Sequence, residues 1–274
     1  MNRLAAAFAA ARAHDRALLI GYLPAGFPSR LEAVALIKAM VENGVDIVEI
    51  GLPYSDPLMD GAVIQQAVLT ALTNGTTTDD VLATVADVAK TGAPTLVMTY
   101  WNPIERYGAD RFAAGLAAAG GVGVITPDLT PEEAGSWVAA TDAHGLDRVF
   151  LVAPSSTPVR IGVVGDIATG FVYAAATMGV TGVRSAMATG VGSVAAELVA
   201  RTRAVLGEGV AVCVGVGVST AEQAAEVAAY ADGVIVGSAF VKAVLDAPTP
   251  AAALTAVSEL AAALAAGVAG RVAV

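Results

Sequence analysis

The segment VDIVEIGLPYSDPLMDG, residues 45–61, decides both the predicted fold and the predicted chemistry. It opens with an apolar, β-branched run from Val45 to Leu52, which is typical of a strand buried on both faces. Glu49 interrupts this run, and a buried carboxylate is costly unless it has a partner or a function. Proline and aspartate then break the regular pattern, and Asp60 with Gly61 ends a loop before a helix. The segment therefore predicts one carboxylate near a strand end and a second in the loop that follows.

The composition describes a large, acidic chain with an ample apolar core. The chain has 274 residues, of which 56% are hydrophobic, enough for a single domain over residues 1–274. The formal net charge of −10 argues against binding to nucleic acid or to an anionic membrane. One cysteine, Cys213, and two histidines, His14 and His144, supply neither a disulfide framework nor a Cys/His metal cluster. We therefore expect a protein without a bound metal in the reducing cytoplasm.

The N-terminal segment resembles an export signal, and the mean hydropathy of the chain resembles that of a membrane protein. The N-terminal sequence MNRLAAAFAAARA resembles a signal peptide, but its apolar run is short and mostly alanine. Arg12, Asp15 and Arg16 follow at once, which favours an amphipathic helix packed under the fold. The mean hydropathy of +0.68 comes largely from alanine, valine and glycine, and polar residues, glycine or proline interrupt the longer uncharged stretches. No transmembrane helix is predicted.

Strand and helix patterns alternate along the rest of the chain. The predicted strands are Ala17–Leu23, Val45–Leu52, Thr95–Tyr100, Val122–Thr126, Arg148–Ala153, Phe171–Ala176, Val210–Gly215 and Gly233–Val236. The predicted helices are Leu31–Val41, Val63–Leu72, Thr78–Ala89, Arg111–Ala119, Pro131–Ala143, Pro158–Ala168, Val194–Val205, Ala221–Tyr230, Phe240–Leu245 and Ala251–Ala265. About eight βα units is the count of an α/β TIM (β/α)8 barrel, here with an extra N-terminal helix. A doubly wound sheet would also alternate strands and helices.

The positions of the glycine-rich turns favour the barrel. No Gly-x-Gly-x-x-Gly follows the first predicted strand, and glycines cluster instead after the late strands, at residues 179–182, 215–217 and 237–238. In TIM barrels the turns after the seventh and eighth strands commonly bind phosphate through backbone N–H groups. The sequence therefore predicts a phosphate site and the carboxylate pair at the same mouth.

Other residues near the predicted strand ends have both a structural and a functional interpretation. Tyr173 is a core aromatic whose hydroxyl could reach the mouth, and Tyr100 lines a pocket or starts a turn. Asp128 is predicted to cap the helix Pro131–Ala143. The glycine-, alanine- and serine-rich segment Thr177–Gly190 is predicted to be a lid over the mouth.

The sequence VEIGLPYSDPLMDG resembles the signature of the tryptophan synthase alpha chain family. The likeness extends along the whole chain through YLPAGFP (22–28), TYWNPIERYG (99–108), PDLTPEEA (127–134), GVTG (179–182), GVGVS (215–219) and GSAFVK (237–242). The resemblance implies a TIM barrel that cleaves indole-3-glycerol phosphate to indole and glyceraldehyde 3-phosphate without a cofactor. It also implies a partner, the pyridoxal-phosphate-dependent beta chain, in an α2β2 assembly.

The resemblance also implies roles for individual residues. Glu49 would serve as the acid, with a further role as the base left open, and Asp60 would accept the indole N–H and stabilise its developing charge. The loop Pro53–Asp60 and the turn at Asn102 would face the partner, and Leu58 would be one of the residues that sandwich the indole. The implied substrate-binding residues are Tyr173, Tyr100, Leu129, Thr181, Gly182, Gly215, Gly217, Gly237 and Ser238.

Three positions depart from the family pattern. Thr177 stands near a lid position where many members carry arginine, and Ala62 and Thr130 stand where proline is frequent. These residues surround the carboxylate pair, so they bear on the lid and the interface more than on the reaction.

Two other functions remain open at this stage. A phosphate-binding barrel that only regulates a partner has no reason to keep both Glu49 and Asp60. A sugar-phosphate isomerase would favour a catalytic histidine or lysine at the mouth, and His14, His144 and Lys242 are not predicted to lie there.

Overall fold

The computed structural model describes residues 3–175 and 191–269 of the chain. Eight parallel strands follow one another around a closed barrel in chain order. Their bounds are β1 (Leu18–Pro24), β2 (Ile47–Gly51), β3 (Thr95–Met98), β4 (Gly123–Ile125), β5 (Asp147–Val152), β6 (Val172–Ala175), β7 (Val212–Gly215) and β8 (Gly233–Val236). The predicted TIM barrel is confirmed, and β8 pairs with β1 to close it. The predicted lid, Thr177–Gly190, lies outside the described residues.

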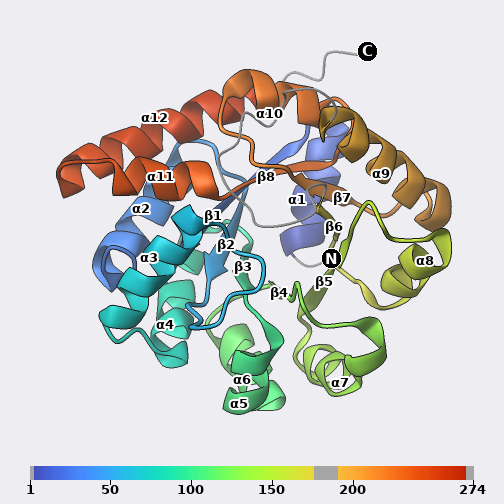
Figure 1. The fold of residues 1–274 in the computed structure, drawn as a ribbon, viewed down its shortest axis with the longest axis horizontal. Helices are drawn as coiled ribbons and strands as arrows, with labels where there is room; N and C mark the ends of the chain where they lie inside the picture. Colours follow the sequence, from blue (N-terminus) through green and yellow to red (C-terminus); the bar gives the residue numbers. More distant parts are fainter. Residues whose placement is uncertain (1–2, 176–190, 270–274) are drawn as a thin grey trace.

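The helices surround the strands, which occupy the centre of the view in Figure 1. Their bounds are α1 (Arg3–Ala13), α2 (Arg30–Glu42), α3 (Ala62–Thr73), α4 (Thr78–Val88), α5 (Trp101–Tyr107), α6 (Ala109–Ala118), α7 (Gly135–His144), α8 (Pro158–Ile167), α9 (Val191–Leu206), α10 (Ala221–Ala228), α11 (Ser238–Leu245) and α12 (Pro250–Ala269). Two short 3₁₀ turns, Ala89–Thr91 and Pro131–Glu133, complete the described elements.

Strand side chains alternate between the inside of the barrel and the helices, as the two-residue period requires. The inward residues form one buried cluster, which includes Ile20, Ile47, Leu96, Ile125, Val149, Phe171, Cys213 and Ile235. Leu4 and Phe8 of α1 belong to the same cluster, and the ring centroids of Phe8 and Phe171 lie 5.9 Å apart. Helix α1 therefore closes the amino-terminal end of the barrel, as predicted for the N-terminal segment.

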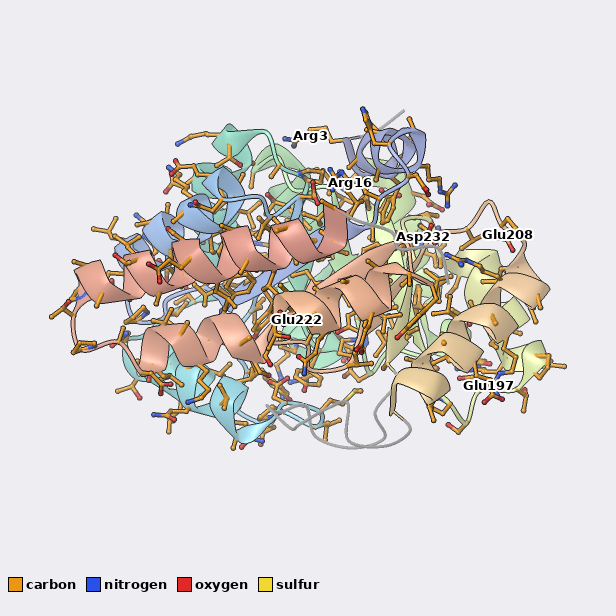
Figure 2. The ribbon with its side chains drawn as sticks, turned by 90° about the horizontal axis from the view of Figure 1, so that it is seen from above. Arg3, Arg16, Glu197, Glu208, Glu222 and Asp232 are labelled. Atoms are coloured by element: carbon orange, nitrogen blue, oxygen red, sulfur yellow. The ribbon has the colours of Figure 1, made fainter. Side chains whose placement is uncertain are left out.

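Ion pairs also fasten this end of the barrel. Both guanidinium NH groups of Arg16 donate to the carboxylate of Asp46, at 2.7 and 2.8 Å, and the same carboxylate accepts the Leu19 N–H. Arg203 donates to Asp232 at 2.9 Å in a similar arrangement. Figure 2 shows Arg16 and Asp232 toward the end of the barrel where α1 lies. These pairs join strand starts to their neighbours and leave the opposite end of the barrel free for a site.

Helix α12 is long and apolar enough to cross a membrane by length and composition alone. Its buried residues, Ala253, Val257, Ala261, Leu264 and Val268, recur every three or four positions. This face packs against α10, α2 and α11. The apolar stripe is thus the core-facing side of an outer barrel helix.

Two details differ from the sequence predictions. The predicted helix Pro131–Ala143 is a 3₁₀ turn followed by α7, because Gly135 is a poor residue for the middle of a continuous helix. Asp128 does not cap it: both carboxylate oxygens of Asp128 lie within hydrogen-bond distance of the Trp101 N–H, at 2.9 and 3.2 Å. The capping prediction is wrong because Asp128 holds the start of α5, a short helix that the sequence analysis missed.

Candidate active site

A cavity opens at the carboxyl ends of the strands, opposite the end that α1 closes. The residues that line it are Tyr22, Glu49, Met59, Asp60, Ile64, Met98, Pro127, Leu151, Tyr173, Ala175, Gly215, Gly217, Ile235, Gly237 and Ser238. They come from all eight strands or from the segments that follow them. Catalytic groups of TIM barrels lie at this end. The cavity brings together the two carboxylates, Tyr173 and the late glycine turns.

Glu49 lies inside the barrel because it follows the inward-facing Ile47 at a spacing of two residues. Its side chain is only 2% exposed, and its Oε1 has no hydrogen-bond partner among the described residues. Loss of hydration disfavours the charged form, so burial raises the pKa of Glu49 to about 8. A carboxyl group that keeps its proton near neutral pH can act as a general acid.

Asp60 is held by a different environment, in the loop between β2 and α3. The Tyr100 hydroxyl donates to Oδ1 of Asp60 at 3.2 Å and accepts the Met59 N–H at 2.9 Å. The Asp60 carbonyl accepts a hydrogen bond from the Gln65 amide at 2.8 Å. Burial raises the pKa of Asp60, and the bond from Tyr100 opposes that rise by stabilising the carboxylate. Tyr100 therefore orients Asp60 and fixes its loop.

Two more tyrosines, Tyr22 and Tyr173, reach the cavity from β1 and β6. Burial is the main cause that raises the pKa of both phenols, and the charges of neighbouring carboxylates add to it. Both hydroxyls consequently stay protonated and can donate hydrogen bonds. A Cβ on Gly215 would lie 2.2 Å from the Tyr173 hydroxyl, so glycine is required there for the ring to fit.

The late glycines form the other end of the cavity. Gly215 ends β7, and Gly217, two residues later, has a positive φ of 79°. Gly237 precedes Ser238, which begins α11, and none of the described side chains caps this helix start. The first N–H groups of a helix have no acceptor within it and favour an anion. This end can bind a phosphate through backbone donors.

The structure also separates some residues that the sequence analysis grouped. Leu129 is 6% exposed and packs in the outer core, and Leu58 is 75% exposed on its loop. Neither is among the described residues that line the cavity. Tyr100 reaches the site through Asp60 and Met59. Thr181 and Gly182 lie outside the described residues.

Sequence reasoning missed several lining residues. Met98 and Leu151 occupy inward positions near strand ends, where the two-residue period could have indicated them. Tyr22 is the register partner of Glu49 on the neighbouring strand. Its proximity to Glu49 depends on that register, which a single sequence does not specify.

Comparison with known proteins gives a consistent result. The family profile described as tryptophan synthase alpha chain matches residues 8–269. The chain belongs to this family. The tryptophan synthase alpha chain of Thermobifida fusca is 56% identical over 269 residues, which cover 98% of each chain. That of Mycobacterium avium is 53% identical over 272 residues, covering 99% of this chain and 96% of the relative.

Solved structures agree with the sequence relatives. A chain in the structure of Mycobacterium tuberculosis tryptophan synthase is 51% identical, with a TM-score of 0.89, over 97% of this chain and 98% of that one. The tryptophan synthase alpha chain from Legionella pneumophila is 32% identical, with a TM-score of 0.85, over 98% and 97%. The tryptophan synthase alpha chain family consists of lyases of tryptophan biosynthesis, so the predicted enzyme class is confirmed at that level.

Two departures from the family pattern have a local account. Thr130 precedes the 3₁₀ turn, and its hydroxyl donates to Glu133 at 3.1 Å, so it supports a turn that proline would otherwise stiffen. Ala62 begins α3 directly after Gly61, where the N-terminal position tolerates either residue. Thr177 lies outside the described residues.

Proposed function

We propose that this chain cleaves indole-3-glycerol phosphate to indole and glyceraldehyde 3-phosphate. The observation that carries the proposal is the pair Glu49 and Asp60, which share one cavity in contrasting environments. Glu49 is fully buried and holds its proton with a pKa of about 8, whereas Asp60 accepts a hydrogen bond that favours its charged form. Two carboxyl groups in such different surroundings can divide acid and stabilising roles.

The reaction needs a proton delivered and a proton removed. Protonated Glu49 gives its proton to C3 of the indole, which leaves positive charge on the ring nitrogen. Asp60 accepts the indole N–H and stabilises that charge. The Glu49 carboxylate then removes the proton of the glycerol hydroxyl beside the ring. The O–H electrons form the aldehyde C=O, the C–C bond breaks, and its electrons return to the ring as neutral indole. Glu49 ends protonated, as it began, and now carries the proton taken from the hydroxyl.

The substrate matches the two ends of the cavity. Its anionic phosphate would bind the backbone donors near Gly215, Gly237 and Ser238. Its apolar ring would lie against Met59, Met98 and similar side chains near Asp60. Since the glycerol chain joins ring and phosphate, the bond that breaks falls beside Glu49.

The family relationship extends the proposal to a partner. We infer that the chain acts in the cytoplasm with a tryptophan synthase beta chain, in an α2β2 assembly that consumes the indole. The alpha reaction is proposed to need no cofactor. Leu58, 75% exposed on the Pro53–Asp60 loop, is suited to contact such a partner.

The test is indole formation from indole-3-glycerol phosphate, with and without a beta chain. Glu49→Gln and Asp60→Asn keep the side-chain sizes, and each should lower turnover by about 100-fold or more, because positioned proton transfer is typically worth that much. Glu197→Gln on the exposed face of α9 is the matched control (Figure 2) and should equal the wild type. Absence of indole with the wild type, or equal turnover of wild type and Glu49→Gln, would refute the proposal.

A further inference from the structure

Tyr22 runs alongside both ends of the cavity. It lies at the register position of Glu49 on the adjacent strand, two residues beyond the inward-facing Ile20. A Cβ on Gly237 would lie 3.3 Å from Cδ1 of Tyr22, and one on Gly51 would lie 2.3 Å from its hydroxyl oxygen. The ring therefore extends from the phosphate end, beside Gly237, to the carboxylate end, beside Gly51.

The position of the Tyr22 hydroxyl depends on the glycine at residue 51. At Gly51 an added Cβ would also lie 2.7 Å from Cζ of Tyr22, closer than any ordinary contact. Glycine at this place in β2 lets the phenol lie flat against the strand end. The hydroxyl thereby reaches the space that Glu49 and Asp60 share.

Tyr100 and Tyr22 differ in how their hydroxyls are used. Tyr100 is committed to Met59 and Asp60 by two hydrogen bonds. The Tyr22 hydroxyl is influenced by the charges of Asp60 and Glu49, yet no hydrogen bond contributes to its environment within the described part of the chain. A protonated phenol that faces a cavity without a protein acceptor is available to a ligand.

We propose that Tyr22 is a substrate-contacting residue whose hydroxyl donates a hydrogen bond to the glycerol oxygen beside the bond that breaks. The inference rests on the proposed cleavage of indole-3-glycerol phosphate. That oxygen loses its proton to Glu49 and gains negative charge before the C=O bond is complete. A fixed neutral donor at this point stabilises the developing charge. Tyr22 keeps its own proton throughout, and no further bond is made or broken.

Turnover supplies the first test. Tyr22→Phe removes only the hydroxyl and leaves the ring against Gly237, so the fold should persist. The kcat for indole formation should fall by roughly tenfold or more. Tyr230→Phe is the matched control, since Tyr230 has a buried hydroxyl without a partner among the described residues and does not line the cavity. Equal kcat for wild type and Tyr22→Phe would overturn the inference.

Binding supplies a second test, which does not depend on turnover. It uses the inert Glu49→Gln chain with and without Tyr22→Phe, titrated by calorimetry with indole-3-glycerol phosphate and with indole-3-propyl phosphate. The second ligand lacks both glycerol hydroxyls. Loss of the donor should weaken binding of the glycerol compound by about 2- to 10-fold and leave the propyl compound unchanged.

The outcomes separate the two proposals. Equal weakening for both ligands would mean that Tyr22 only shapes the cavity wall, and no weakening for either would mean that its hydroxyl contacts neither. Both results overturn the inference while leaving the reaction intact. Tight binding of the glycerol compound without any wild-type indole formation would instead overturn the proposed function.

Discussion

Replacing Glu49 by glutamine should change how the stability of the barrel depends on pH. The folded chain holds this carboxyl group at a pKa of about 8, raised from 4.5 by burial. Below pH 4.5 both the folded and the unfolded chain carry the proton, so Glu49 does not change the free energy of unfolding with pH. Between pH 4.5 and 8 only the unfolded chain releases the proton, so the free energy of unfolding falls as pH rises.

The size of this effect follows from the shift. A difference of about 3.5 pKa units corresponds to roughly 4–5 kcal/mol, at 1.36 kcal/mol for each unit. Glutamine has the shape of the protonated acid and does not titrate. The stability of Glu49→Gln relative to the wild type should therefore increase by about 4 kcal/mol between pH 5 and pH 8 and then stay level.

Urea denaturation of the two proteins at pH 5, 6, 7, 8 and 9 measures this difference. Chains of this size often unfold through intermediates, so the transition that melts the barrel should be followed by amide exchange in β2 as well as by circular dichroism. A carbon NMR titration of the labelled glutamate carboxyl groups locates the pKa directly. Parallel stability curves, or a Glu49 carboxyl group that titrates near pH 4.5, would refute the account of its burial.

Two further substitutions test the supports of the site and of the fold. Tyr100→Phe removes the hydrogen-bond donor that favours the charged form of Asp60. The kcat/KM should fall by about tenfold, and the acidic limb of the pH profile of kcat/KM should move to higher pH. An unmoved limb would show that Tyr100 does not stabilise the carboxylate. Arg16→Ala breaks the paired hydrogen bonds to Asp46 at the far end of the barrel. The free energy of unfolding should fall by about 1–3 kcal/mol, while kcat stays within twofold of the wild type. A large loss of kcat would contradict the separation of the two ends.

The sequence was sufficient for the succession of βα units because its evidence is local and repeated, and the late glycine-rich turns then favoured a barrel over a doubly wound sheet. Each βα unit carries its own apolar strand, its own helix period and its own turn residues, so errors at single boundaries do not change the count. The largest structural error, at Asp128, is of another kind. Whether that carboxylate caps the next helix or the start of α5 depends on how β3 and β4 lie beside each other, and both choices satisfy the same local rule.

Some residues of the candidate site could likewise be predicted from the sequence and others could not. Glu49 stood out in the sequence because a carboxylate in an apolar strand is expensive wherever the strand lies. Tyr22 did not, since an aromatic residue in a strand is ordinary, and only the pairing of β1 with β2 makes it a neighbour of Glu49. Leu129 was grouped with the indole site through the family resemblance and its apolar side chain, yet that side chain packs into the outer core. Residues that break a local rule were predictable, whereas those that matter through register were not.

The raised pKa of Glu49 also affects the charge of the cavity that would bind the phosphate. The chain carries a net charge of −10, and no lysine or arginine is among the described residues that line the cavity. Among these described residues an anionic phosphate would meet backbone donors but no countercharge, and each ionised carboxylate in the cavity would oppose it. In the proposed reaction, protonated Glu49 removes one such charge and also supplies the proton for C3.

This reasoning predicts that substrate affinity depends on the same titration as catalysis. As pH rises through about 8, Glu49 loses its proton, so kcat should fall and the dissociation constant for indole-3-glycerol phosphate should rise together. The dissociation constant for indole-3-glycerol phosphate is measured at pH 7 and pH 9 for the wild type and for Glu49→Gln. A short assay time keeps the substrate intact with the wild type. The phosphate group has a second pKa near 6, so it is already about nine-tenths doubly ionised at pH 7 and changes little up to pH 9. The variant should therefore bind nearly equally at both pH values. If the variant loses affinity as much as the wild type does, the repulsion comes from another group, and the neutrality of Glu49 matters for proton transfer alone.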